Sequence, residues 1–268
     1  MRVDIEKRLQ SDYKQVEELG YEVLCVMVQG SQNYNLEYEG SDVDTKAIVL
    51  PKFNSIIFSK QPASTTLVLP SNEHIDIKDI RIMFECYRRQ NINFLETLFS
   101  KYELCNPKYV EYWEKLKSNR ELIAHYNTHS AVKCIVGMML EKYKALEHPY
   151  PSLIDKIEKY GYDPKQLHHI VRCLEFLKNY INDVPFENCL IPADREYLIS
   201  IKRIPPRYSL KEARELAKNC IDEAKEIERN YLANNELYIN TDAALILDNI
   251  LDSVLRKSIF DELKGNSN

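Results

Sequence analysis

The spacing of apolar positions predicts mixed secondary structure in the first hundred residues. Residues 4–19 carry apolar side chains at helical spacing, and Gly20 ends that helix. The nearly continuous apolar run at 22–29 predicts a buried strand that ends at Gly30. The other elements expected before residue 107 are strands at 43–50, 65–69 and 73–78, and a helix that Asp79 caps.

Beyond Pro107 the pattern is almost entirely helical. Helices are expected at 107–117, 119–126, 129–147, 152–160, 163–181, 194–202, 209–233 and 242–263. This change predicts two domains, 1–106 and 107–268. We expect an α+β protein in which a small mixed sheet with flanking helices is followed by an all-helical C-terminal region.

Composition narrows the class of protein. The 36 basic and 41 acidic residues give a net charge of −5, which does not indicate a protein that coats nucleic acid through bulk charge, so a polynucleotide substrate would need a local basic patch. The longest apolar runs, 23–28 and 135–140, are too short to span a bilayer, so we expect no membrane segment. Seven cysteines without a CxxC pair indicate neither a disulfide framework nor a zinc site, and reduced thiols fit a cytoplasmic protein.

The residues with the clearest chemical meaning lie between the first two predicted strands. Gly30 permits a tight turn, and a short helix beginning near Ser31 would aim backbone N–H groups and a hydroxyl at a phosphate. Asp42 and Asp44 follow after ten intervening residues. On an extended strand both carboxylates project from one face, while Val43 points to the core.

A third carboxylate is expected on a neighbouring strand. Alternation through residues 74–78 places Asp76 on one face with His74 and Lys78. Three carboxylates in one place favour Mg²⁺ or Mn²⁺, and two such ions can clamp a phosphoryl group during in-line transfer. Asp76 is then the candidate general base or a further metal ligand. If the register of this strand differs, Asp79 is the third carboxylate and Asp76 is not. Either motif alone, Gly-Ser or Asp-x-Asp, more often marks an ordinary turn or the start of a strand.

The combined pattern of Gly30-Ser31, Asp42-Val43-Asp44 and a downstream strand aspartate resembles the nucleotidyltransferases of the DNA polymerase β superfamily. Residues 75–99, IDIKDIRIMFECYRRQNINFLETLF, and 161–177, GYDPKQLHHIVRCLEFL, resemble a bacterial and phage branch associated with RNA repair. The resemblance implies transfer of a nucleoside monophosphate from an NTP, with Asp42, Asp44 and Asp76 as metal ligands. It also implies that Gly30 and Ser31 contact phosphates.

A second group of candidates lies on the helix predicted at 163–181. Lys165, His169 and Arg172 recur along one stripe, with apolar residues on the reverse. Periodicity alone favours a solvated basic face, whereas the resemblance favours contact with the triphosphate or acceptor phosphates.

Two classes of function follow from these residues. The first is a metal-dependent nucleotidyltransferase whose acceptor is an RNA or tRNA end or a protein hydroxyl. The second is a non-catalytic protein that retains the fold and binds a nucleotide or RNA. The sequence does not indicate the acceptor, the preferred base or the oligomeric state.

Overall fold

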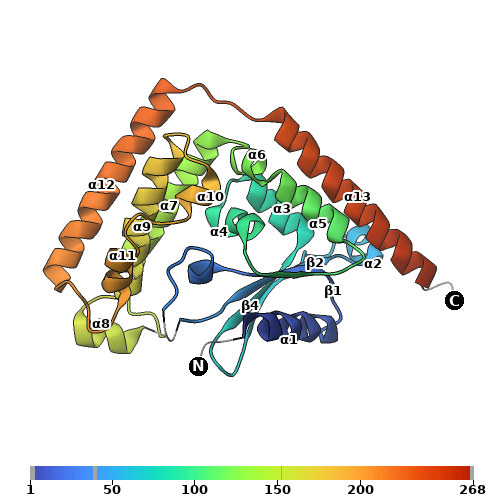
Figure 1. The fold of residues 1–268 in the computed structure, drawn as a ribbon, viewed down its shortest axis with the longest axis horizontal. Helices are drawn as coiled ribbons and strands as arrows, with labels where there is room; N and C mark the ends of the chain where they lie inside the picture. Colours follow the sequence, from blue (N-terminus) through green and yellow to red (C-terminus); the bar gives the residue numbers. More distant parts are fainter. Residues whose placement is uncertain (1–3, 39–40, 152, 266–268) are drawn as a thin grey trace. The chain divides into compact units, whose positions relative to one another are not determined.

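The structure is a computed structural model that describes residues 4–38, 41–151 and 153–265 (Figure 1). Its contacts divide the chain into two compact units. The first, here called the sheet unit, comprises residues 1–33, 39–126 and 239–268. The second, the helical unit, comprises residues 34–38 and 127–238.

The sheet unit contains a mixed five-stranded sheet in the order β3-β4-β2-β1-β5. Its strands are β1 Glu22–Val28, β2 Thr45–Leu50, β3 Ser64–Val68, β4 His74–Asp79 and β5 Glu103–Cys105. β2 and β4 are parallel, and the other three pairs are antiparallel. The four expected strands are confirmed, although β2 begins at Thr45, so Asp42 and Asp44 precede the strand. The short edge strand β5 was not predicted.

Alternation along the strands gives the sheet two different faces. One face presents Val26, Val28, Ala47 and other apolar residues to Leu9 and Val16 of α1. α1 lies on that side of the sheet, and α3 and α5 lie on the other (Figure 1). Asp4 caps α1 by accepting a hydrogen bond from the Lys7 backbone.

The remaining elements are helices, several of them short. The sheet unit holds α1 Ile5–Glu18, η1 Gly30–Gln32, α2 Phe53–Ile57, α3 Ile80–Arg88, α4 Ile92–Leu95, η2 Glu96–Phe99, α5 Val110–Ser118, α6 Arg120–Ala124 and α13 Thr241–Gly265. The helical unit holds α7 Thr128–Ala145, α8 Ile154–Tyr160, α9 Pro164–Tyr180, α10 Phe186–Cys189, α11 Arg195–Lys202 and α12 Leu210–Asn234.

The expected α+β class is confirmed, with a mixed sheet, flanking helices and a helical C-terminal region. The contacts place α5, α6 and α13, which lie beyond the predicted boundary at 106/107, in the sheet unit. None of the described helices combines the length and the apolar character needed to cross a membrane.

Candidate active site

The turn after β1 is built on Gly30, whose φ of 79° lies in the left-handed region that favours glycine. The predicted short helix is a three-residue 3₁₀ helix, Gly30–Gln32. The Gly30 N–H donates to Glu96 Oε1 at 3.2 Å, so this donor is not free for a phosphate. The buried Asn33 side chain supports the turn by donating to the Val28 carbonyl at 2.9 Å. Of the donors expected to bind a phosphate, the Gly30 N–H is therefore already used, and those near Ser31 are left.

The Gly-Ser turn and the aspartate segment, residues 42–44, are adjacent at one end of the sheet. Val28 pairs with Thr45 across the antiparallel strands β1 and β2. One residue further, the Gln29 N–H donates to the Asp44 carbonyl at 3.0 Å. The two motifs, ten residues apart in sequence, are thus brought together by strand register.

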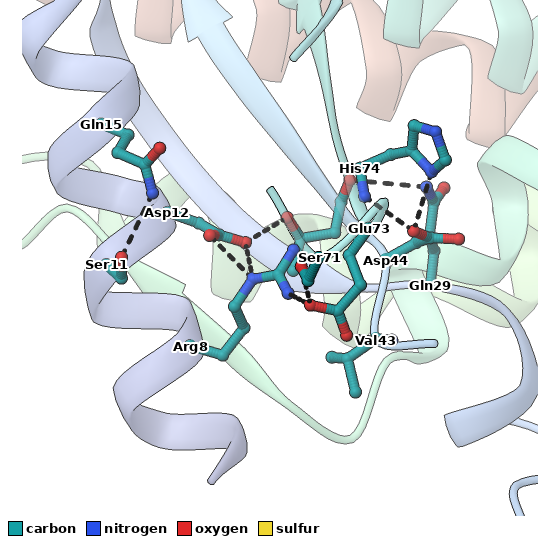
Figure 2. A network of polar contacts seen from close by, with 11 residues as sticks. Arg8, Ser11, Asp12, Gln15, Gln29, Val43, Asp44, Ser71, Glu73 and His74 are labelled. Atoms are coloured by element: carbon teal, nitrogen blue, oxygen red, sulfur yellow. Dashed lines mark hydrogen bonds and ion pairs between the residues drawn. The ribbon is translucent and has the colours of Figure 1, made fainter. Parts of the chain in front are cut away.

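Within the aspartate segment, burial of the three side chains alternates as predicted for extended backbone. Val43 is buried in the core, Asp42 is exposed, and Asp44 is about one-third exposed. Asp44 Oδ1 accepts a hydrogen bond from the His74 backbone N–H at 2.8 Å and lies 3.2 Å from His74 Nδ1 (Figure 2). His74 at the start of β4 therefore orients Asp44, a contact that sequence reasoning did not identify.

Asp76 lies on the same face of the sheet as Asp44, displaced along the strand direction. It pairs in register with Lys46, which is two residues, or roughly 7 Å, beyond Asp44. Lys46 Nζ lies 2.7 Å from one oxygen of Asp76, and Lys78 Nζ lies 3.0 Å from the other. The Lys46 ammonium is almost fully buried and sits 4.1 Å from the centre of the Phe94 ring.

These lysines decide the protonation state of Asp76. Burial opposes ionisation of the carboxyl group, but the charge and hydrogen bond of Lys46, aided by Lys78, outweigh it and hold the pKa of Asp76 below its ordinary value. Burial in turn lowers the pKa of Lys46, and Asp76 opposes that change. A carboxylate with weakened proton affinity is a poor general base.

Asp79 performs the capping role expected of it. Its carboxylate accepts from the Arg81 backbone N–H at 2.9 Å and pairs with the Arg81 guanidinium at 2.7 Å. Alternation along β4 leaves Asp79 buried on the face opposite Asp76. Asp79 is therefore the N-cap of α3 and does not share a face with the other candidate carboxylates.

The predicted metal ligands fit a divalent cation only in part. Asp42 and Asp44 offer carboxylate oxygens from one short segment, but both oxygens of Asp76 are bound by ammonium groups. Across residues 4–38, 41–151 and 153–265, no three His, Cys, Asp or Glu side chains meet as a group that could hold a metal ion. Asp76 thus lies on the same face of the sheet as Asp44, but it does not form a ligand group with Asp42 and Asp44.

A buried ionic network supports the aspartate segment from the α1 side (Figure 2). Arg8 Nε lies 2.8 Å from both oxygens of Asp12, and Arg8 Nη1 pairs with Glu73. Asp12 accepts from Thr45 Oγ1 at 2.7 Å, and Glu73 accepts from the Val43 N–H at 2.9 Å. The segment is therefore held at both Val43 and Thr45. The spacing of Arg8 and Asp12, i and i+4 on a helix, was the signal available in the sequence.

The candidate basic stripe of the helical unit differs from its prediction. Lys165 is exposed, but Arg172 is 93% buried, with its guanidinium 4.1 Å from the Tyr34 ring centre. Desolvation, reinforced by Arg172, lowers the pKa of His169 well below its ordinary value, so this imidazole is neutral near pH 7. The expectation of a solvated basic face is wrong at Arg172, whose buried charge is stacked on an aromatic ring. Within the described chain Arg172 Nε has no hydrogen-bond partner.

Two further cations of the helical unit bind the peptide that follows the Gly-Ser turn. Arg195 donates to the carbonyls of Asn35 and Glu37 at 2.5 and 2.6 Å. Lys202 donates to the Leu36 carbonyl at 2.8 Å. Desolvation and the nearby cations Lys165 and Arg172 lower the pKa of Lys202 to about 8. These contacts explain why residues 34–38 belong to the helical unit.

Comparisons with known proteins add little to this site. No family model matches the chain, and no curated protein sequence matches it. A solved structure described as a nucleotidyltransferase-like protein from Exiguobacterium sibiricum 255-15 aligns over 93% of this chain and 80% of that one, with 11% identity and a TM-score of 0.30. A likeness at that TM-score does not establish a shared fold.

Proposed function

We propose that the chain is a nucleotidyltransferase that transfers a nucleoside monophosphate from an NTP to an acceptor hydroxyl and releases pyrophosphate. The observation that carries the proposal is the adjacency of the Gly-Ser turn and the aspartate segment, joined by the Gln29–Asp44 backbone hydrogen bond. In the proposed site the hydroxyl binds a phosphate oxygen, and the two carboxylates bind the divalent cation that a polyphosphate carries.

The proposed roles follow from the contacts of each residue. Ser31 contributes its hydroxyl to a phosphate oxygen, and Asp42 and Asp44 hold Mg²⁺ or Mn²⁺, which supplies positive charge to the triphosphate. His74 orients Asp44 through its backbone N–H. Asp76 can be the third ligand only if its ion pairs with Lys46 and Lys78 break. Its assignment as a metal ligand stays a prediction.

Lys165, His169 and Arg172 keep their proposed phosphate role in a revised form. Arg172 and Lys165 supply charge, whereas a neutral His169 supplies no charge and offers one ring N–H donor and one acceptor nitrogen. An RNA or tRNA end and a protein hydroxyl remain the proposed acceptors, with RNA repair as the proposed setting.

The second candidate function is non-catalytic binding of a nucleotide or RNA. The observation that favours it is the engagement of Asp76 by two lysines, which leaves no three-carboxylate group among the described residues. This candidate predicts NTP binding without product under any divalent metal.

The test is transfer of label from α-labelled NTPs, with Mg²⁺ or Mn²⁺, to RNA, tRNA or protein acceptors. We expect Asp42→Asn to lower transfer by about 100-fold or more, because it removes one carboxylate from the cation. Asp252→Asn is the matched control, since Asp252 is an exposed aspartate of α13. Equal transfer by wild type and Asp42→Asn would overturn the assignment of Asp42.

A further inference from the structure

Two cysteines face each other across the edge of the sheet. Cys25 of β1 and Cys105 of β5 are direct partners in the antiparallel pair. Their Sγ atoms lie 2.6 Å apart, and both residues are free cysteines in the structure. They are 80 residues apart in sequence, so the pair is created by the fold and by no local motif.

The hydrogen bonds of the ladder define the type of this pair. The Val28 N–H donates to the Tyr102 carbonyl at 3.0 Å, and the Asn106 N–H donates to the Leu24 carbonyl at 2.9 Å. Hydrogen-bonded pairs alternate with non-hydrogen-bonded pairs along antiparallel strands. The cysteine pair therefore occupies a non-hydrogen-bonded position.

That position has the backbone spacing a disulfide requires. The Cα atoms of a non-hydrogen-bonded pair approach to about 4.5 Å. Disulfides bridge Cα atoms about 4.4 to 6.8 Å apart, so closure needs little movement of either strand. The hydrogen bond from the Asn106 side chain to the Val23 carbonyl, at 3.0 Å, holds the adjacent end of β5 against β1.

We propose that Cys25 and Cys105 are a modification site, at which a small-molecule disulfide oxidant converts the two thiols into an intramolecular disulfide that links β1 to β5. The proposal is independent of nucleotidyl transfer. It requires only the strand register and the sulfur contact.

The order of the chemical steps follows from exposure. Cys105 is half-buried and Cys25 is fully buried, so the Cys105 thiolate attacks the oxidant first. One sulfur of the oxidant joins Cys105, and the other leaves as a thiol. The Cys25 sulfur, after losing its proton to solvent, then attacks the Cys105 sulfur and releases the second thiol. Two protein thiols are oxidised and one small disulfide is reduced to two thiols.

The second step is expected to be the slow one. Burial, together with the hydrogen bond to Cys105, raises the pKa of Cys25 well above its ordinary value. Closure should therefore be faster at pH 9 than at pH 7.

The experiment exposes the reduced full chain to oxidised glutathione, alkylates the remaining thiols and maps disulfides by mass spectrometry. We expect a Cys25–Cys105 cross-link with a mass loss of about 2 Da, reversed by dithiothreitol. Because the link closes a long loop, the sheet unit should melt on the order of 10 °C higher when oxidised. Cys86→Ser, at another half-buried cysteine of the sheet unit, should still form the link.

Two results would overturn the proposal. One is a glutathione adduct on Cys105 that persists at pH 9 without closing onto Cys25. The other is unmodified Cys25 and Cys105 under conditions in which Cys86 becomes modified. Cys105→Ser should form neither the cross-link nor the rise in melting temperature, and if that variant does not fold, the mapping of the wild-type chain decides alone.

Discussion

A buried arginine on α1 connects the contacts made to Val43, in the aspartate segment, and to Thr45, which follows the segment. Arg8 neutralises Asp12, which is fully buried and binds Thr45, and it also pairs with Glu73, which binds the Val43 N–H. Burial raises the pKa of Asp12 despite these partners. Asp12 therefore depends on Arg8 and Thr45 to remain ionised in the core, and the position of Asp42 and Asp44 depends on that network.

Replacement of Arg8 should be costly. Arg8→Ala leaves the buried Asp12 and Glu73 without their cation, and removal of one partner from a buried pair typically lowers the free energy of unfolding by about 3 kcal/mol. Lys7→Ala is the matched control, because the Lys7–Asp4 pair is exposed to solvent and should contribute little to stability. Urea unfolding measures both. Equal stability of the two variants would mean that the network does not support the segment.

Residue-scale predictions succeeded where the signal was local. Asp79 was predicted to cap a helix, and it does, because a cap depends only on the residues that follow it. The Asp44–His74 and Lys46–Asp76 contacts depend on the parallel register of β2 and β4, which the sequence does not encode in any short window. For the same reason the cysteine count could not reveal the Cys25–Cys105 pair.

At the scale of elements, the packing of α9 against α11 buries a titratable group. The His168 imidazole donates from Nδ1 to the Leu198 carbonyl at 2.8 Å. Desolvation lowers the pKa of His168 to about 3, and it also lowers the pKa of His169. Both histidines are therefore neutral in the folded helical unit.

This burial predicts a pH dependence of stability. Below pH 6.5 the unfolded chain binds protons that the folded chain does not, so the free energy of unfolding falls as pH drops from 6.5 towards 3. Each such histidine contributes at most about 1.4 kcal/mol per pH unit. His168→Gln should have a shallower slope by up to that amount. An unchanged slope in His168→Gln would contradict the burial of a neutral imidazole.

The long helices were predicted well, whereas the shortest elements were predicted only in part. α9 and α12 follow from a sustained 3.6-residue period and from the caps Asp163 and Ser209, whereas α7 and α13 follow from long runs of helix-forming residues. β5 spans three residues and gives no usable period, so it was not predicted. A short helix near Ser31 was predicted, but its 3₁₀ form was not. The hydrogen bond from the Gly30 N–H to Glu96 could not be predicted, because Glu96 is 66 residues away in the sequence.

At the scale of the whole molecule, the last helix belongs to the sheet unit. α13 contacts α3, α5 and α6, and Leu247 on its inner face is fully buried, whereas Leu245 is 59% exposed. Leu247→Ala should destabilise the sheet unit by about 2 to 4 kcal/mol, and Leu245→Ala should have little effect. Hydrogen exchange should show lost protection in α3 and α5 of the Leu247 variant, with α7 and α9 unchanged. Loss of protection confined to α7 and α9 would contradict the assignment of α13.

The most direct test of the proposed function measures NTP binding and pyrophosphate release in the same preparation, with Mg²⁺ or Mn²⁺ and a mixture of RNA, tRNA and protein acceptors. We expect wild type to release pyrophosphate, and Asp44→Asn to release it at least about 100-fold more slowly while its helical unit stays folded. Asp252→Asn should match wild type. Binding of NTP by wild type with no pyrophosphate release under either metal would rule out the proposed nucleotidyl transfer and favour a non-catalytic binding protein.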